Sequence, residues 1–458
     1  MTALAGALSA GPLADTIVAV ATPSGRGALA IIRLSGPEAF FIGQRHIKPW
    51  NADSRVARLC SVYDGNVLLD HALVTVFSSP HSFSGDDTVE ISAHGGYLVP
   101  SLIVATLISS GARQALPGEF TRRAVLNGKL DMIQAEAIGD LIDARSHVMQ
   151  RTALSQLDGG LSRRLLQLRD DLIGLEALIA YDIDFPEEDD GPISRESIEI
   201  ATEAILSSLD ELLATAPAGE LLRDGAIVVI AGFPNVGKSS LFNALLGKSR
   251  AIVTEIPGTT RDALEAVVDS GAWPLRLVDT AGLRSTEDRI ERMGIEVSER
   301  YLSEAHVVLA CAETSGDLEN TVTSIATRCT APIVGVRTKA DLVANGDELV
   351  GAGTVSVSAE TGKGLPELLS AINNALASQH GELSQDIPML TRARHRYALT
   401  SAHSEIEQFD RTWRGEKLPA PVASVHLRTA VGLLEELIGA VDVEDVFDRV
   451  FSSFCVGK

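Results

Sequence analysis

The residues with the most evident chemistry form the segment GFPNVGKS at 232–239. Two glycines followed by Lys and Ser are typical of a phosphate-binding loop, because glycine lets backbone N–H groups converge on phosphate oxygens. Lys238 is then expected to reach the β- and γ-phosphates of a nucleotide, and Ser239 to bind Mg²⁺. Apolar residues 227–231 before the loop predict a buried parallel strand, and the leucines from Leu241 onward predict a helix. This strand–loop–helix context favours a nucleotide site over a chance glycine-rich turn.

Two later segments supply candidate metal and phosphate contacts. The segment TEIPGTTRD at 254–262 has the character of a switch loop, and the Thr260 hydroxyl is expected to complete Mg²⁺ coordination. The segment DTAG at 279–282 follows a predicted strand. Its Asp279 carboxylate is expected to hold Mg²⁺ through the water shell, and the N–H of Gly282 to contact the γ-phosphate. Their order and spacing are typical of a GTPase.

The segment TKAD at 338–341 indicates which base is recognised. Asp341 can accept two hydrogen bonds from guanine, a donor pair that adenine lacks. The segment SAE at 358–360 is expected to close over the base. Thr338 replaces the usual Asn of this motif, and its hydroxyl has a shorter reach. We expect guanine selectivity to persist through Asp341 with weaker binding, and a degenerate, inactive site is the alternative.

These segments together define a predicted GTP site. Its residues are Asn235, Val236, Gly237, Lys238, Ser239, Ser240, Thr254, Glu255, Ile256, Pro257, Gly258, Thr259, Thr260, Asp279, Thr280, Ala281, Gly282, Thr338, Lys339, Ala340, Asp341, Ser358, Ala359 and Glu360.

The hydrolytic step lacks two familiar groups. Leu283 follows the DTAG segment where Ras-like enzymes place a glutamine that orients water, and no arginine finger is evident. Either hydrolysis is slow or another group acts. Asn235 and the carbonyl-rich loop 254–259 can together bind a monovalent cation that stabilises charge on the transferring phosphoryl group.

Composition excludes several classes of protein. The chain has 458 residues, enough for two to four domains, and its net charge of −22 argues against nucleic-acid binding as its main source of affinity. Its four cysteines are scattered without metal-binding spacing, which fits a reduced cytosol, so we expect a cytoplasmic protein. The first residues lack a basic region typical of a signal peptide, and no run is apolar enough for a membrane span.

The patterning predicts an α/β and α chain in three parts. Residues 1–125 are expected to form a mixed α/β domain, and residues 126–220 and 381–458 a discontinuous helical-bundle domain. Residues 221–380 alternate strands and helices, as in a doubly wound P-loop domain inserted between them. An insertion of this kind is tolerated when the termini of the insert lie close together.

Specific elements follow from hydrophobic periodicity. Predicted strands in the first part are 16–21, 28–34, 73–77 and 88–92, with a helix at 99–110. In the inserted part, strands are predicted at 227–231, 275–278, 307–310 and 333–336. Helices are predicted from 194 to about 214, and at 394–413, 423–440 and 443–451.

Four further blocks identify a family. They are TIVAVATPSGRGALAIIRLSG at 16–36, PHSFSGDDTVEISAHGG at 80–96, PGEFTRRAVLNGKLDMIQAEAIGDLIDA at 117–144 and the terminal FCVGK at 454–458. With the GTPase motifs, they make the chain resemble the MnmE (TrmE) family of tRNA modification GTPases over essentially its whole length. The phosphate loop is widespread, whereas the N-terminal blocks with the terminal Cys-x-Gly-Lys are specific to this family.

The resemblance implies a partner and a reaction. Members of the family are homodimers whose N-terminal domain mediates dimerisation and binds formyl-tetrahydrofolate. With the FAD-dependent protein MnmG, in a heterotetramer, they install an aminomethyl or carboxymethylaminomethyl group at C5 of the wobble uridine, position 34, of certain tRNAs. Tetrahydrofolate, in formyl or methylene form, supplies the one-carbon unit. GTP hydrolysis is stimulated by potassium and coupled to dimerisation of the GTPase domains.

The resemblance also implies roles for individual residues, carried over position by position. The K⁺ ligands correspond to Asn235, Thr254, Ile256 and Thr259, and the Mg²⁺ ligands to Ser239 and Thr260. The catalytic residues are Lys238 and Glu291, the latter orienting the attacking water indirectly. The formyl-tetrahydrofolate site corresponds to Arg33, Glu90, Lys129 and Lys458. Without the resemblance, Glu291 and the folate-site residues read as ordinary surface or interface charges.

The sequence leaves open the role of Cys455 and two other functions for the chain. Cys455 resembles a nucleophile with Lys458 nearby to lower its thiol pKa, but a structural role is at least as well supported. A regulatory ribosome-assembly GTPase would share the phosphate loop and Leu283, although it would lack the N-terminal blocks and the terminal FCVGK. A third interpretation is a folate-dependent transferase in which the GTPase serves as an accessory switch. It differs from the tRNA-modifying GTPase mainly in which of the two activities is regarded as central.

Overall fold

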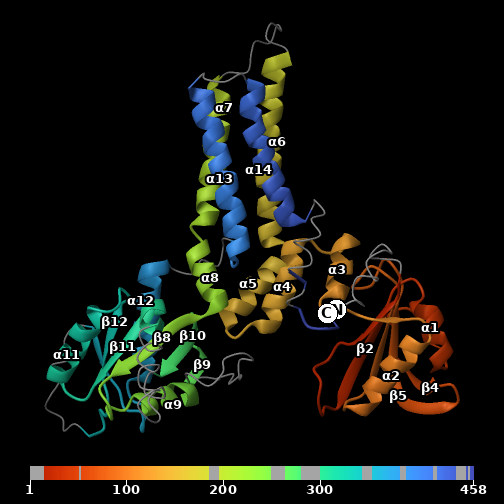
Figure 1. Ribbon diagram of the computed structural model, residues 1–458, viewed down its shortest axis with the longest axis horizontal. Helices are drawn as coiled ribbons and strands as arrows, with labels where there is room; N and C mark the ends of the chain where they lie inside the picture. The colour runs from red at the N-terminus through yellow and green to blue at the C-terminus, as the bar shows by residue number, and fades with distance from the viewer. Residues whose placement is uncertain are drawn as a thin grey trace, which may run out of the picture. The chain divides into compact units, whose positions relative to one another are not determined.

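The protein is described by a computed structural model of the whole chain. The described residues are 15–50, 53–184, 195–248, 264–279, 300–342, 353–381, 388–415, 420–439, 450–451 and 454–457. The chain forms two compact units, and Figure 1 shows their elements. The first unit comprises residues 1–139 and 435–458, and the second comprises residues 140–434.

The first unit is built on a mostly antiparallel sheet. Among its described residues seven strands pair in the order β3-β4-β5-β6-β2-β1-β7, and β7 alone of these runs parallel to its neighbour. The strands are β1 (Ile17–Val20), β2 (Leu29–Ser35), β3 (Ile47–Lys48), β4 (Arg58–Asp64), β5 (Val67–Phe77), β6 (Thr88–His94) and β7 (Arg113–Gln114). The helices are α1 (Ala39–His46), α2 (Leu98–Ser109), α3 (Glu119–Leu126) and α4 (Met132–Asp143), whose last residues belong to the second unit.

Helices α1 and α2 cover one face of this sheet. Ile42 of α1 and Leu107 of α2 pack into a buried cluster with the inward-facing strand residues Ile32 and Ile91. Because side chains alternate along a strand, the neighbouring residues point to the opposite face. The start of α3 reaches this opposite face, where Phe120 is buried against β1.

The predicted strands at 16–21, 28–34, 73–77 and 88–92 correspond to β1, β2, part of β5 and β6, and the predicted helix to α2. The sequence interpretation omitted β4. Its alternation is obscured because the apolar Leu59 is exposed beside the buried Cys60, and the register of β4 with β5 shifts between Val62 and Tyr63. Two-residue strands such as β3 carry no periodicity to detect.

The second unit contains a mostly parallel sheet. Among its described residues the order is β13-β12-β11-β8-β10-β9, with β9 antiparallel to β10. The strands are β8 (Ala226–Gly232), β9 (Leu264–Asp269), β10 (Pro274–Asp279), β11 (Val307–Ala312), β12 (Ile333–Arg337) and β13 (Thr354–Ser356). The four strands predicted here are confirmed as β8, β10, β11 and β12.

Helices lie on both faces of this second sheet. Leu241 of α9 (Lys238–Lys248) and Ile372 of α12 (Leu365–His380) pack into one buried cluster with Val228. Leu318 of α11 (Ser315–Ala326) packs on the other side with Val229. Adjacent residues of β8 therefore face different helix layers, which is the doubly wound arrangement predicted from the sequence.

The remaining described helices of the second unit differ in length, and the four longest lie side by side (Figure 1). They are α5 (His147–Leu157), α6 (Gly160–Asp184), α7 (Arg195–Leu213), α8 (Ala216–Asp224), α13 (Ala393–Arg414) and α14 (Ala420–Ile438), of which α14 extends into the first unit. Helix α7, before the sheet in the chain, packs against both α6 and α13, which follows the sheet. The helix predicted at 443–451 lies almost wholly outside the described residues.

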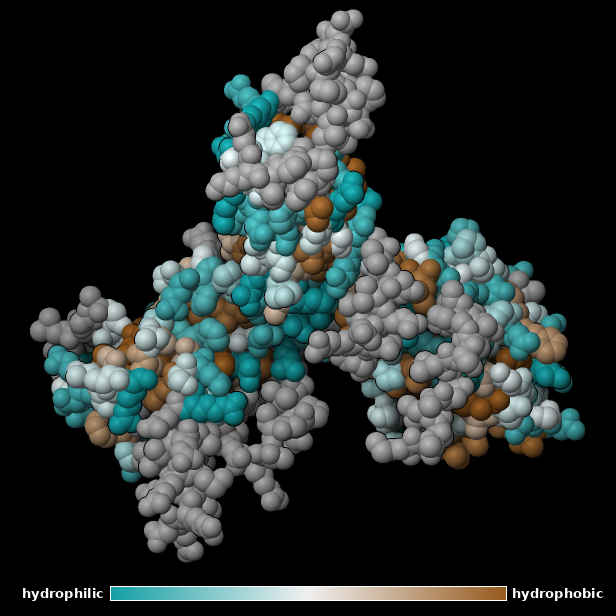
Figure 2. Space-filling model, turned by 45° about the horizontal axis from the view of Figure 1, so that its top comes forward, coloured by the Kyte–Doolittle hydropathy of each residue, from teal (hydrophilic) through white to brown (hydrophobic). Residues whose placement is uncertain are grey.

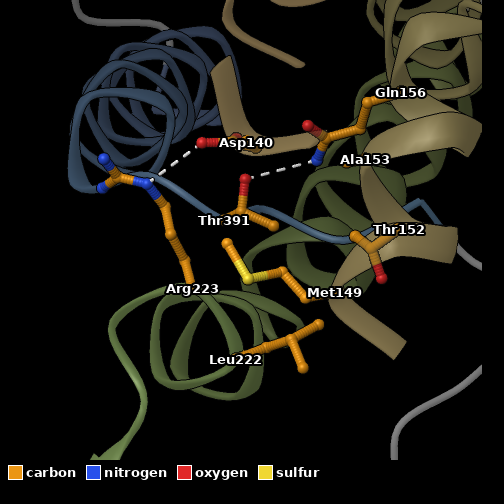
Figure 3. A pocket seen from close by; sticks show the side chains of 8 residues that line it. All are labelled: Asp140, Met149, Thr152, Ala153, Gln156, Leu222, Arg223 and Thr391. Carbon is orange, nitrogen blue, oxygen red and sulfur yellow. Dashed lines mark hydrogen bonds and ion pairs between the residues drawn. The ribbon is translucent and has the colours of Figure 1, made fainter. Parts of the chain in front are cut away.

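A small pocket marks where the chain enters and leaves the second sheet (Figure 3). The Asp140 carboxylate accepts hydrogen bonds from Arg223 at the end of α8 (3.3 Å) and from Arg392 just before α13 (2.7 Å). The Gln156 amide of α5 donates to the carbonyl of Met389 (2.9 Å). Both connections between the sheet and the long helices are thus held to α4 and α5.

The surface is mixed in character. On the face that Figure 2 shows, hydrophilic and hydrophobic residues intermingle wherever the residues are described, in keeping with 22% charged residues. None of the helices in the described part of the chain combines the length and apolarity that a membrane crossing requires.

Candidate functional site

The phosphate loop joins the end of β8 to the start of α9. Gly232 has φ +153°, and a Cβ at this position would lie 2.3 Å from the Cys311 carbonyl oxygen of β11. A side chain there would separate the loop from its neighbouring strand, so the loop requires glycine at this point. Helix α9 begins at Lys238, and its N-terminal N–H groups supply the partial positive charge that anions prefer.

Lys238 is almost fully buried beneath this loop. Its ammonium group donates to the carbonyl oxygens of Gly232 (3.1 Å) and Phe233 (2.8 Å). These contacts hold the ammonium group against the carbonyl oxygens of the loop, and its predicted contact with the β- and γ-phosphates stays a prediction. A γ- or β-phosphate oxygen competes for the same donors with a full negative charge, which makes a stronger hydrogen bond than a carbonyl.

Ser239 and Asp279 meet at the mouth of the loop. The Ser239 hydroxyl donates to Oδ2 of Asp279 at 2.7 Å, and Asp279 is buried at the end of β10. A hydroxyl and a carboxylate are oxygen ligands of the kind that Mg²⁺ accepts alongside waters and phosphates. The two residues therefore fit the predicted magnesium site. In the described part of the chain, no group of three or more His, Cys, Asp and Glu side chains could hold a metal ion.

Thr338, the departure from the usual Asn, is buried against the phosphate loop. Its hydroxyl donates to the Val236 carbonyl at 2.6 Å, and its backbone N–H donates to the Ala312 carbonyl at 2.9 Å. The shorter side chain thus still reaches across because the end of β12 lies directly beside the loop. Thr338 links the guanine motif to the phosphate loop, although the consequence for affinity stays a prediction.

Lys339 makes a second link to the same loop. Its ammonium group donates to the Asn235 carbonyl (3.2 Å) and forms an ion pair with Glu313. Lys339 and Asn235 both have positive φ, which is uncommon for residues other than glycine. The sequence interpretation missed Glu313. The available signal was its position directly after β11, comparable to the position of Asp279 as the last residue of β10.

Asp341 lies on the exposed side of this motif, next to the third loop. A hydrogen bond from the Ser358 hydroxyl lowers the pKa of the Asp341 carboxyl, which keeps it in the ionised form that accepts hydrogen bonds. The Ala340 N–H donates to the Val357 carbonyl at 3.0 Å. The structure therefore brings 338–341 and 358–360 together, including Ala359 and Glu360.

Several assigned residues lie outside the described part of the chain. They are Thr254, Glu255, Ile256, Pro257, Gly258, Thr259, Thr260, Thr280, Ala281, Gly282, Glu291 and Lys458. Of the predicted K⁺ ligands the described residues include Asn235, and of the two Mg²⁺ ligands they include Ser239.

Two of the predicted folate-site residues, Arg33 and Glu90, form an ion pair in the first unit. They are cross-strand partners on β2 and β6, on the face opposite α1 and α2. Nε and Nη2 of Arg33 donate to the same Glu90 oxygen at 2.9 and 2.8 Å. The guanidinium group also lies over the rings of Phe83 (5.3 Å) and Phe120 (5.5 Å), two contacts that the sequence interpretation did not identify.

The other predicted folate-site elements lie in the same unit. The Lys129 ammonium group donates to the Pro80 carbonyl at 3.0 Å, three residues from Phe83. The C-terminal residues also reach this unit, because the Gly118 N–H donates to the Cys455 carbonyl at 3.3 Å and Val456 bridges to Pro117. Cys455 is exposed at this position, and Phe120 follows Gly118 closely in the chain.

An ionic network fixes the start of α3 near these residues. Arg113 and Arg123 both bind the carboxylates of Asp15 and Glu119, and Arg123 is buried. Burial alone would raise the pKa of Glu119, but hydrogen bonds from Arg113 and from the Leu116 N–H outweigh it and lower that pKa. Burial would likewise raise the pKa of Asp15, but hydrogen bonds from Arg113 and Arg123 outweigh this effect and lower that pKa.

Comparison with known proteins gives matches over nearly the whole chain. Residues 16–129 match the family described as GTP-binding protein TrmE N-terminus, and residues 132–455 match the MnmE helical domain. The tRNA modification GTPase MnmE of Moorella thermoacetica is 40% identical, with 97% of this chain and 100% of that protein covered. The proteins of the same name from Aquifex aeolicus (38% identical; 97% and 100% covered) and Legionella pneumophila strain Corby (40%; 97% and 99%) are also similar.

Proposed function

Because the chain belongs to the MnmE family of tRNA modification GTPases, we propose that it hydrolyses GTP and acts in the modification of tRNA. The observation that carries the proposal is the pairing of the Ser239 hydroxyl with the Asp279 carboxylate at the mouth of the phosphate loop. The hydrogen bond from Ser358 to Asp341 supports guanine as the base.

The residues of this site have distinct roles in the proposed reaction. Lys238 binds the β- and γ-phosphate oxygens, and Thr338 and Lys339 keep the loop carbonyls of Val236 and Asn235 in place. Ser239 directly, and Asp279 through the water shell, would hold Mg²⁺, which when bound neutralises charge on the phosphates. Asp341 selects guanine by accepting from its N1–H and N2 amine, as proposed from the motif.

Hydrolysis in this proposal depends on K⁺. Asn235, with Thr254, Ile256 and Thr259, supplies the K⁺ ligands, and Thr260 completes the Mg²⁺ site. Glu291 orients the attacking water indirectly, because Leu283 lacks a group that can do so. These roles rest on the family resemblance together with the positions of the described residues Asn235 and Ser239.

The first unit, in this proposal, binds a formyl-tetrahydrofolate through Arg33, Glu90, Lys129 and Lys458 and mediates homodimerisation. The contact of Arg33 with Glu90 and the position of the C-terminal residues beside Pro117 and Gly118 support it. With MnmG the chain modifies C5 of the wobble uridine. The three-part division at residues 125, 220 and 380 belongs to the same proposal. The ribosome-assembly alternative is less favoured because the family match includes the N-terminal residues 16–129.

The test is nucleoside analysis of tRNA from a host strain that lacks its own gene of this family. The chain is expected to restore the C5 modification of the wobble uridine, and the Lys238→Ala variant is not. Arg328→Ala, which removes an exposed cation of the same unit, is the matched control and should restore it fully. A chain that leaves the uridine unmodified while being folded and expressed would contradict the proposal.

A further inference from the structure

We propose that Phe83 forms an aromatic wall of the ligand site at Arg33 and Glu90, against which the flat heterocycle of a reduced folate stacks. The inference rests on the proposed folate binding and adds a recognition residue to it. It follows from the loop that carries Phe83, from the setting of the Arg33 guanidinium and from the exposure of the Phe83 ring.

The loop between β5 and β6 is fixed to the sheet. The Ser84 hydroxyl is buried and hydrogen-bonds to the Ser35 hydroxyl at 2.7 Å. The Asn127 amide, at the end of α3, donates to the Ser84 carbonyl at 2.7 Å. Gly85 has φ +87°, and a Cβ there would lie 2.7 Å from the Asn127 side chain. The loop is thus clamped between β2 and α3 directly beside Phe83, which holds the ring in position before any ligand arrives.

The Arg33 guanidinium group has aromatic contacts of two different kinds. The Phe120 ring, 5.5 Å from it, is fully buried and belongs to the packing of α3 on β1. The Phe83 ring, 5.3 Å from it, is 37% exposed. Burial of Phe120 already stabilises the fold, whereas an exposed ring held by a rigid loop gains little from folding. An exposed aromatic ring next to a polar pair is typical of a recognition surface.

The polar pair indicates the class of ligand. Since Arg33 and Glu90 neutralise each other, they are a poor receptor for a simple anion. They present hydrogen-bond donors next to acceptors, which matches a heterocycle whose edge carries both, such as the amino and oxo groups of a pterin. The Lys129 ammonium group lies at the Pro80 end of the same loop, where a carboxylate tail would meet a positive charge.

The test measures binding of 5-formyltetrahydrofolate to the full chain by titration calorimetry. Phe83→Leu removes the aromatic face but keeps an apolar side chain, and is expected to weaken binding roughly tenfold. Phe83→Tyr keeps the ring and should bind within about twofold of wild type. Phe41→Leu is the matched control, because Phe41 is also exposed in this unit and also lies beside an arginine, Arg45, at 5.0 Å.

The outcomes separate this inference from the proposal that it rests on. Wild-type binding with equal binding by Phe83→Leu would overturn the inference and leave the folate proposal standing. An equal loss in Phe83→Tyr would also overturn it, because the ring would then not be what matters. No binding by the wild-type chain would remove the folate proposal and this inference together.

Discussion

The two sites differ in what positions their functional groups. In the second unit, Lys238, Ser239, Asp279 and Thr338 lie at the ends of strands and at the start of α9, and hydrogen bonds to one another or to the phosphate loop hold them. In the first unit, Arg33 and Glu90 lie within paired strands of a regular sheet. A site at strand ends can change shape as its loops move, whereas a site on a sheet face is rigid. This difference is consistent with the proposed roles, nucleotide-dependent switching in the second unit and binding of a folate in the first.

The largest expected effect concerns base selection at the loop site. Asp341→Asn should replace the two acceptor oxygens of the carboxylate with one acceptor oxygen and one amide donor. Because xanthine has an oxo group where guanine has the N2 amine, the preference should shift from GTP to XTP. Relative kcat/KM for the two nucleotides should change on the order of a thousandfold, since a base that leaves polar groups unpaired is strongly rejected. Steady-state hydrolysis of both nucleotides measures it. Unchanged use of GTP would show that Asp341 does not read the base.

The next effect concerns the sheet site. Glu90→Gln should weaken binding of 5-formyltetrahydrofolate by roughly ten- to a hundredfold, because it removes the charged partner of Arg33. GTP hydrolysis without tRNA should stay at the wild-type rate. Asp53→Asn, which alters an exposed ion pair with Arg58 in the same unit, is the control. If Glu90→Gln lowered basal hydrolysis, the two sites would not be separable as described.

A smaller effect is expected at Thr338. Thr338→Val keeps the shape but removes the hydroxyl that donates to the Val236 carbonyl, and should weaken GTP and GDP binding about fivefold. Thr338→Asn restores the usual motif and should bind at least as well as wild type. Equilibrium titration with a fluorescent guanine nucleotide measures both. Full affinity in the valine variant would mean that this link does not support the loop.

The smallest effect is a difference in acid sensitivity between the units. In the second unit burial lowers the pKa values of His306 and His380, whose rings are 5.9 Å apart, with Arg276 and Asp224 also near His306. The Ile227 N–H donates to Nδ1 of His306, a bond that protonation removes. The stability that the neutral histidines contribute to the folded state is fully present above their pKa in the unfolded chain, near 6.5. It falls as the pH drops below that value, because the unfolded state then binds more protons than the folded state.

In the first unit, the lowered pKa values of Asp15 and Glu119 have a different consequence. Their stabilisation is present above the usual carboxyl pKa values and is lost only as the pH falls below about 4. Between about pH 7.5 and about pH 5.5 the melting temperature should fall by roughly 2–4 °C, and His306→Asn should reduce this fall. The exposed His147→Asn is the control. An equal fall in His306→Asn would contradict the assignment.

The same contrast explains what could be predicted from the sequence. The phosphate loop could be predicted because phosphate binding requires glycine, Lys and Ser at fixed spacing. The strand before it is a short apolar run that is also recognisable in the sequence. Arg33 and Glu90 are 57 residues apart, and the register of two strands brings them together, so the residues alone gave no reason to connect them. The family resemblance supplied that connection.

Contacts that depend on loop conformation were not predictable. The reach of the Thr338 hydroxyl depends on how closely β12 lies beside the phosphate loop, and the pairing of Lys339 with Glu313 depends on β11 and β12 being neighbours. Periodicity gives the strands but not their order. Phe83 likewise came within a quoted sequence block, yet its position over Arg33 depends on hydrogen bonds from Ser84 and Asn127.

The most direct test of the account is steady-state hydrolysis of GTP by the purified chain in potassium chloride and in sodium chloride, with ATP as the control nucleotide. We expect a large stimulation by potassium with GTP and negligible hydrolysis of ATP in either salt. Equal rates in the two salts would contradict the cation site at Asn235, and comparable hydrolysis of ATP would contradict guanine recognition by Asp341.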